Sequence, residues 1–255
     1  MKRFIGLLAA AVVLGAHGLA RAADPSVLWH IVNDRCIPDQ ETRHDPAPCS
    51  LVDLAGGRAH GYVVLKDIVG IGQFLLMPTA HITGIESPEI LAPGIPNYWD
   101  LAWKSRHFTE ERLHTTLRRE DLSLAVNSML GRTQDQLHIH IDCIRPDVKA
   151  ALAAHLAEIG PDWSPFPVKL AGHTYRAMRV DGQELGENDP FHLLATGDPG
   201  AASSMGLHTL VVTGATFPDH GTGFIILDDK ADLAAGNHAS GEELQDHSCA
   251  IASAE

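Results

Sequence analysis

A segment that alternates between polar and apolar residues constrains the fold most. From Gln134 to Ile144 the sequence is QDQLHIHIDCI, in which Leu, Ile and Cys alternate with Gln, His and Asp. A period of two is typical of a β-strand with one buried face. Alternate residues of a strand lie about 6 to 7 Å apart, so His138, His140 and Asp142 would form one row, close enough to act on one phosphate or one metal ion. The alternative is the solvated face of an edge strand, which more often carries Lys, Glu or Thr.

The first 22 residues have the pattern of an export signal. Lys2 and Arg3 precede an apolar run from Phe4 to Ala20, and Ala20-Arg21-Ala22 has the small-x-small form of a cleavage site. The run also approaches the shortest length that spans a membrane. Residues 1–22 are therefore either a cleaved signal peptide or a retained membrane anchor, and in both cases the folded part lies beyond the membrane.

Export predicts that the four cysteines form disulfides, because they would meet an oxidising compartment. Four cysteines allow three pairings. Cys36 with Cys49 is the simplest, since it closes a Pro-rich loop, and it leaves Cys143 for Cys249.

Charge and composition limit the class of partner. The chain has 255 residues, 45% of them hydrophobic, which is enough for the core of one large domain or of two fused small ones. It carries 19 Lys and Arg against 32 Asp and Glu, which argues against a nucleic-acid surface. A small or lipid-linked nucleotide remains compatible with this balance.

Periodicity elsewhere predicts an α+β protein. Strands are expected at 60–66 and 73–78 as a hairpin, at 122–127 paired with the histidine strand, and at 173–180, 207–213 and 223–227. Helices are expected from Asn97 to about Arg119 and from Pro146 to Ile159. In the tail after Asp228, which we expect to be loop and short helix, His238 and His247 are expected to be surface or capping residues.

Two stretches resemble the histidine-triad (HIT) superfamily of nucleotide hydrolases and transferases. LKDI followed by QFLLMPTAHI resembles the nucleotide-binding hairpin of that superfamily, and residues 127–142 resemble its Asn, Gly-Gln and His-x-His-x-His segment. The resemblance implies a HIT-like antiparallel sheet with flanking helices over about residues 60–145. A β-rich C-terminal part, about residues 163–255, would extend it.

A narrower resemblance covers nearly the whole exported chain. The cysteine positions and the motifs GYVVLKD, FLLMPTAHITGIESP, QLHIHIDCIRPDV and GNHASGEELQDHSC resemble bacterial CDP-diacylglycerol pyrophosphatases. This implies one domain over residues 25–255 that hydrolyses CDP-diacylglycerol to CMP and phosphatidate at the periplasmic face of the inner membrane, or free in the periplasm after signal cleavage. The implied partners are the lipid-linked nucleotide and the membrane surface, with no nucleic acid and no cofactor or metal.

The resemblance also assigns roles to single residues. His140 holds the middle position of the triad and would be the nucleophile, whereas His138 would orient the site and contact phosphate. Asp142 stands where most of the superfamily has a third His, so an imidazole-orienting role is the alternative for it. Asp67 matches the ribose-binding acid, and the remaining substrate contacts would be Lys66, His81, Asn127, Gln134 and Gln136.

Two other classes of function compete with this one. His138, His140 and Asp142 also resemble part of the His-x-His-x-Asp-His zinc signature of metallo-β-lactamase-fold hydrolases, with water as the nucleophile. Cys143 stands where that signature has its next His, and the intervening Ile residues suit a strand better than a ligand loop. The third class is a non-catalytic module that binds a nucleotide or a lipid, in which His140 would be idle.

Overall fold

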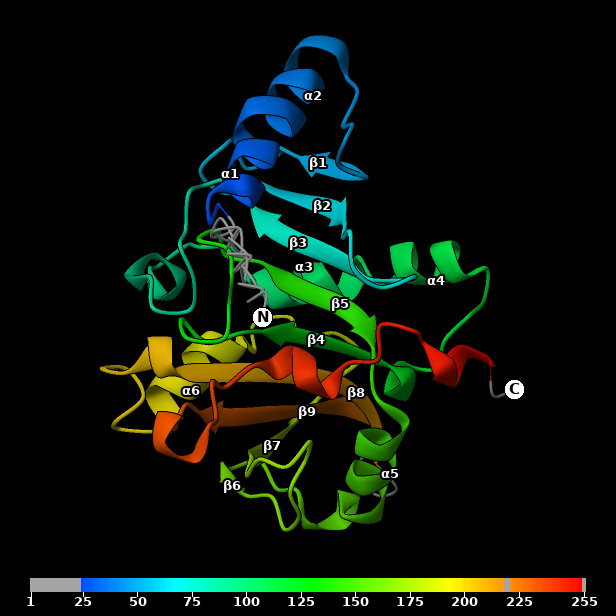
Figure 1. The fold of residues 1–255 in the computed structure, drawn as a ribbon, viewed down its shortest axis with the longest axis vertical. Coiled ribbons are helices and arrows are strands. Elements are labelled where there is room, and N and C mark those ends of the chain that lie inside the picture. The colour runs from blue at the N-terminus through cyan, green and yellow to red at the C-terminus, as the bar shows by residue number, and fades with distance from the viewer. Residues whose placement is uncertain (1–23, 218–220, 254–255) are drawn as a thin grey trace, which may run out of the picture.

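One antiparallel sheet organises the protein (Figure 1). The computed structural model describes residues 24–217 and 221–253, so the predicted export segment lies outside the described residues. Within that part the sheet has nine strands in the order β1-β2-β3-β5-β4-β8-β9-β7-β6. The strands are β1 (Leu51–Asp53), β2 (Tyr62–Lys66), β3 (Phe74–Pro78), β4 (Leu122–Val126), β5 (Ile139–Cys143), β6 (Ser164–Pro165), β7 (Arg176–Asp181), β8 (His208–Phe217) and β9 (Gly221–Lys230).

Short helices cover the sheet. They are α1 (Val27–Ile31), α2 (Ile37–Arg43), α3 (Tyr98–Lys104), α4 (His107–Leu113), α5 (Pro146–Ala154) and α6 (Pro190–Gly197), and a π-helical turn, Val32–Cys36, joins the first two. Single 3-10 turns lie between several of the other elements. Within residues 24–217 and 221–253, none of the helices combines the length and the apolar character needed to cross a bilayer.

The two halves of the chain repeat one topology. Each half forms a hairpin, then a helix, then a second hairpin: β2–β3, α3 and β4–β5 in the first, and β6–β7, α6 and β8–β9 in the second. Counted outward from the centre, the strand order is β4, β5, β3, β2 on one side and β8, β9, β7, β6 on the other. The halves meet where β4 pairs with β8, and the helices meet where Trp99 packs on Phe191 with ring centroids 5.3 Å apart. The predicted β-rich C-terminal half is therefore confirmed, and it continues the same sheet.

The two faces of the sheet differ in how they are covered. On one face α3 and α6 join the strands in a single apolar cluster that includes Trp99 and Trp103. On the other face there are two clusters, one formed with α1 and α2 over β2 and β3, the other with α5 over β8 and β9. His140 is opposite Leu75 of β3 and Ala125 of β4, which belong to these two clusters. The polar row of β5 thus lies between two apolar patches.

The prediction of one continuous helix from Asn97 to about Arg119 is wrong, because two short helices, α3 and α4, occupy this segment. Asn97 does cap the first of them, since its Oδ1 accepts hydrogen bonds from the backbone of Trp99 and Asp100. The helix stops at Lys104, and a second one ends at Leu113, where His114 takes a left-handed conformation. The apolar residues Trp103, Phe108 and Leu113 are five apart, a spacing that one straight helix cannot keep on a single face.

Two other boundaries differ from the prediction. The helix that begins at Pro146 ends at Ala154 and continues as a 3-10 turn, Leu156–Glu158. Strands β8 and β9 extend to ten residues each, beyond the predicted 207–213 and 223–227. Gly214 lies inside β8, where a Cβ would come within 2.7 Å of the Arg119 carbonyl oxygen, so this close approach requires glycine.

Candidate active site

A cavity of about 320 Å³ opens over the polar row of β5. His138 and His140 lie at its base, and α1, the end of β2 and the segment near Glu242 enclose it. Its lining residues are Val27, Leu28, Ile31, Leu65, Lys66, Asp67, Ile68, Val69, Leu75, Asn127, Gly131, Thr133, Gln134, His138, His140 and Glu242. Two of the three predicted polar residues, His138 and His140, therefore face a cavity and not bulk solvent.

His140 is held through one of its two ring nitrogens. Its Nδ1 lies 2.7 Å from Nε2 of Gln73 and 3.2 Å from Oε1 of Glu242. The two contacts suit different tautomers of the neutral ring: the Gln73 amide donates to an unprotonated Nδ1, whereas the Glu242 carboxylate can only accept from a protonated one. The buried Nε2 has no hydrogen-bond partner among the described residues. Burial, reinforced by nearby His138, lowers the pKa of His140 well below its ordinary value, so the ring is neutral at pH 7.

His138 is fixed in the complementary way. Its Nδ1 donates to the backbone oxygen of Gln136 at 2.6 Å, which leaves Nε2 as the acceptor. Its ring stands edge-on to that of His140, with centroids 4.7 Å apart. Burial lowers the pKa of His138 as well. The site therefore holds two neutral imidazoles, and that of His138 keeps Nε2 unprotonated.

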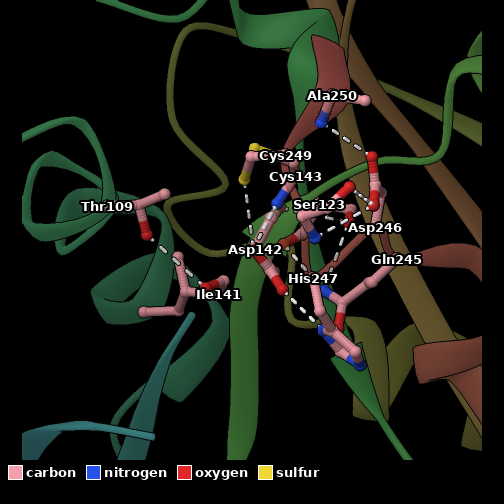
Figure 2. The surroundings of a disulfide bond; sticks show 11 residues. Thr109, Ser123, Ile141, Asp142, Cys143, Gln245, Asp246, His247, Cys249 and Ala250 are labelled. Atoms are coloured by element: carbon pink, nitrogen blue, oxygen red, sulfur yellow. Dashed lines mark hydrogen bonds and ion pairs between the residues drawn. A yellow bond between two sulfur atoms is a disulfide. The ribbon is translucent and has the colours of Figure 1, made fainter. Parts of the chain in front are cut away.

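Asp142 points into a separate contact with the C-terminal segment (Figure 2). Its Oδ2 accepts a hydrogen bond of 2.8 Å from Nδ1 of His247, and its Oδ1 accepts one of 2.8 Å from the backbone of Cys143. Burial raises the pKa of Asp142, whereas the hydrogen bond to Asp142 raises that of His247. Nε2 of His247 lies 3.8 Å from Oε1 of Glu242, so a chain of polar groups links Asp142 to the His140 ring.

Both disulfides pair as the sequence analysis favoured. Cys36 bonds to Cys49, and Cys143 bonds to Cys249 (Figure 2). The second bond joins β5, next to Asp142, to the segment that carries Glu242 and His247.

The prediction that His247 is a surface or capping residue is therefore wrong. Its side chain is about one-third exposed and contacts the buried Asp142. Glu242 and Gln73 were also missed, because they are separated from His140 by 102 and 67 positions of sequence. The available signal was the position of Cys249, two residues after His247, together with its expected pairing to the neighbour of Asp142.

Four of the predicted substrate contacts line the cavity: Lys66, Asp67, Asn127 and Gln134. Asn127 donates from Nδ2 to Oε2 of Glu242 at 2.7 Å and accepts from the backbone of Glu242 at 3.3 Å. Nζ of Lys66 donates to the backbone oxygens of Asp67 and Gly70. These groups hold the walls of the cavity in place while they present polar atoms to it.

The other two predicted contacts lie outside the cavity lining. His81 is exposed and stacks on Trp29, with ring centroids 4.6 Å apart. Gln136 is buried and donates from Nε2 to the backbone oxygens of Pro78 and Ala80, at 2.9 and 3.1 Å. Gln136 therefore ties the end of β3 to the segment that leads into β5.

The geometry does not support the zinc alternative. Within the described residues, the groups whose ligand atoms all lie within 4.8 Å of one another are Asp142 with Cys143 and Cys249, and His173 with Asp229 and Glu243. His138, His140 and Asp142 do not form such a group. Both cysteines of the first group are in a disulfide, and both Asp142 oxygens already accept hydrogen bonds.

The contact between Asp142 and His247 predicts a pH-dependent contribution to stability. The pKa of His247 is raised above 6.5, so its contribution is present in full below about pH 6 and is lost as pH rises through the raised pKa. In urea unfolding from about pH 5.5 to about pH 8.5, wild type should therefore lose stability relative to His247→Gln as pH increases. Glutamine keeps a donor for Asp142 but does not titrate. A difference between the two proteins that stays constant over this range would contradict the ion pair.

Comparison with known proteins gives one consistent family. A family model described as CDP-diacylglycerol pyrophosphatase matches residues 23–253. A CDP-diacylglycerol pyrophosphatase of Yersinia pestis is 44% identical over 253 residues, which cover 98% of this chain and 95% of the relative. Both matches extend over the two halves of the sheet, from α1 to the segment that carries His247. The chain is therefore a hydrolase that belongs to the CDP-diacylglycerol pyrophosphatase family.

Proposed function

We propose that this chain hydrolyses the pyrophosphate bond of CDP-diacylglycerol, giving CMP and phosphatidate, through a covalent intermediate on His140. The observation that carries the proposal is the arrangement of the His140 ring. Gln73 and Glu242 hold Nδ1, while the unpartnered Nε2 belongs to a neutral ring at the base of the cavity. A neutral imidazole held in one orientation is the form of His that attacks phosphorus.

The first step forms one bond and breaks one. In the tautomer whose Nδ1 proton is donated to Glu242, Nε2 of His140 attacks the phosphorus of the cytidylyl group. The bridging P–O bond to phosphatidate breaks, with its electron pair leaving on the phosphatidate oxygen. Phosphatidate is a stabilised phosphate leaving group, so this step does not need a strong general acid. The ring becomes positively charged as the bond forms, and the carboxylate of Glu242 next to Nδ1 stabilises that charge.

The second step returns the ring to its starting state. Water attacks the phosphorus of the cytidylyl group, the P–N bond to His140 breaks, and CMP is released. The edge-on His138 keeps an acceptor lone pair on Nε2, because its Nδ1 donates to Gln136, and it takes the proton from the attacking water. Splitting the reaction in this way replaces one difficult displacement by two easier ones.

The remaining cavity residues suit the two ends of the nucleotide. Asp67, at the end of β2, offers carboxylate oxygens for the ribose hydroxyls, and Lys66 next to it brings a positive charge toward the phosphates. Asn127 and Gln134 add amide groups to the cavity lining. Asp142 orients His247 and stays out of the reaction, which accounts for a carboxylate where the HIT superfamily has a third His.

We propose that the reaction takes place on the periplasmic side of the inner membrane. The basic start and apolar run of residues 1–22 support this, whether that segment anchors the chain or is removed as a signal peptide. The two disulfides support an oxidising compartment as well.

The test is hydrolysis of CDP-diacylglycerol by the purified full chain in the presence of excess chelator. We expect release of CMP and phosphatidate at the rate seen without chelator, because His140 and not a metal-bound water is the nucleophile. Activity that the chelator abolishes and zinc restores would overturn the mechanism. An inactive protein under both conditions would overturn the proposed substrate.

A further inference from the structure

The cavity has one wall that the chemistry of the reaction does not use. Beside the two histidines, seven apolar side chains line it: Val27, Leu28, Ile31, Leu65, Ile68, Val69 and Leu75. They come from α1, from the end of β2, from the β2–β3 loop and from β3. A nucleotide and its phosphates gain little from such a wall, whereas an aliphatic chain gains free energy in proportion to the apolar area that it buries.

The same wall continues outward as an exposed apolar rim, which we define as Val27, Ile68, Val69 and Ile71. Their exposed fractions are 44%, 100%, 47% and 55%. Eight large apolar side chains are exposed in the described part of the chain, and half of them belong to this rim. Three of the four also line the cavity. Single exposed apolar residues are ordinary, but a cluster at the mouth of a binding site indicates an apolar partner.

Hydrogen bonds fix the conformation of the β2–β3 loop, which carries most of the rim. Asp67 donates its backbone N–H to Gln73 across the loop at 3.1 Å, and Ile71 donates its own to the backbone oxygen of His247 at 3.0 Å. Nζ of Lys66 closes the loop from inside by donating to Gly70 at 2.9 Å. Ile68 is therefore presented to solvent by a fixed backbone, and its exposure is not the result of a loop without contacts.

The N-terminal side of the chain enters the structure at this same mouth. Gln134, which lines the cavity, donates to the backbone oxygen of Asp24 at 3.0 Å and accepts from the backbone of Leu28 at 3.1 Å. Only three residues separate Asp24 from Ala20, the end of the apolar run. The four Cα–Cα steps from Ala20 to Asp24 span at most about 14 Å, so the apolar run, where it is retained, joins the protein close to the cavity mouth.

We propose that the rim inserts into the lipid bilayer, and that the acyl chains of the substrate pass from the cavity between α1 and the β2–β3 loop into the bilayer. The inference rests on the proposed function. The nucleotide end of the substrate then reaches His140 while its diacylglycerol end stays in lipid. Because the chain has a net charge of −13, anionic lipids do not attract it as a whole. We therefore expect apolar insertion to be the main source of its binding to the bilayer.

The first experiment compares two substrates with the full chain carrying Ile71→Asn. This residue belongs to the rim but does not line the cavity, and its hydrogen bond to His247 uses the backbone N–H, which asparagine keeps. For long-chain CDP-diacylglycerol in phosphatidylcholine vesicles we expect kcat/KM to fall about tenfold. For a dissolved dihexanoyl analogue we expect a change of less than about twofold. Leu233→Asn is the matched control, because Leu233 is exposed to a similar degree, 59%, and lies outside the rim.

Equal effects of Ile71→Asn on both substrates, or no effect on either, would overturn the inference. If wild type hydrolyses neither substrate, the proposed function fails instead, and a second measurement decides the inference. In Ile68→Trp, the added tryptophan fluorescence should be quenched by vesicles whose acyl chains carry bromine, whereas that of Leu233→Trp should not. Absence of quenching at position 68 would show that the rim stays in water.

Discussion

His140→Ala is expected to lower kcat by at least about 10⁴-fold, the range found when a covalent nucleophile is removed. The variant loses the group that we propose carries the cytidylyl intermediate, and the neighbouring His138 and Glu242 are held by other contacts. The measurement is the steady-state rate of CMP release, combined with the intact mass of wild type and variant after a rapid acid-free quench. Wild type should gain one cytidylyl group, and His140→Ala should gain none.

A second His→Ala change controls for this result. His192 lies on α6 with a side chain about half exposed, in the half of the sheet that does not contribute to the cavity lining. His192→Ala should keep both the rate and the adduct. An adduct that persists in His140→Ala, or a variant that keeps more than about a hundredth of the wild-type rate, would rule out His140 as the nucleophile.

Removing the Cys143–Cys249 disulfide is expected to have the largest effect on stability. The bond closes a loop with a sequence separation of 106, for which loop-closure entropy predicts about 4 to 5 kcal/mol of stabilisation. Both cysteines are fully buried, so Cys143→Ala with Cys249→Ala is the cleanest replacement. The measurement is the free energy of unfolding in urea for wild type and the double variant.

The first disulfide provides the comparison. Cys36 and Cys49 are 13 apart, and the same reasoning gives about 3 kcal/mol for their removal. Replacing that pair should therefore destabilise the protein less. The Cys143–Cys249 variant should also change the pH dependence described for His247, because the segment next to Asp142 is no longer tied to β5. An equal loss of stability for the two pairs would contradict the loop-closure argument.

The sequence predicted those parts of the fold that depend on local patterns. Alternation identified β5 and placed His138 and His140 on one face, and Asn97 marked the start of α3. Turn residues located the β2–β3 hairpin. Each of these depends on residues within a few positions of one another, where backbone geometry follows directly from residue type.

The contacts that the sequence could not predict join segments that only the complete sheet brings together. Glu242 and His247 reach the site only because the chain returns across β4 and β5 after completing the second half. The pairing of β4 with β8, which joins the halves, has no local signal either, since the sequence of Leu122–Val126 indicates a strand but not its partner. The contact between Trp99 and Phe191 depends on the same pairing. Such contacts follow from packing between segments about a hundred residues apart.

The pairing of β4 with β8 also affects whether molecules of this protein can associate through an open strand edge. With the first half alone, β4 would be an open edge of five buried residues, ready to hydrogen-bond with another molecule. Here that edge is always occupied, because its partner strand belongs to the same polypeptide. The occupancy does not change with dilution, as that of a subunit interface would. The second half of the chain thus keeps the edge of β4, the neighbour of β5, covered at every protein concentration.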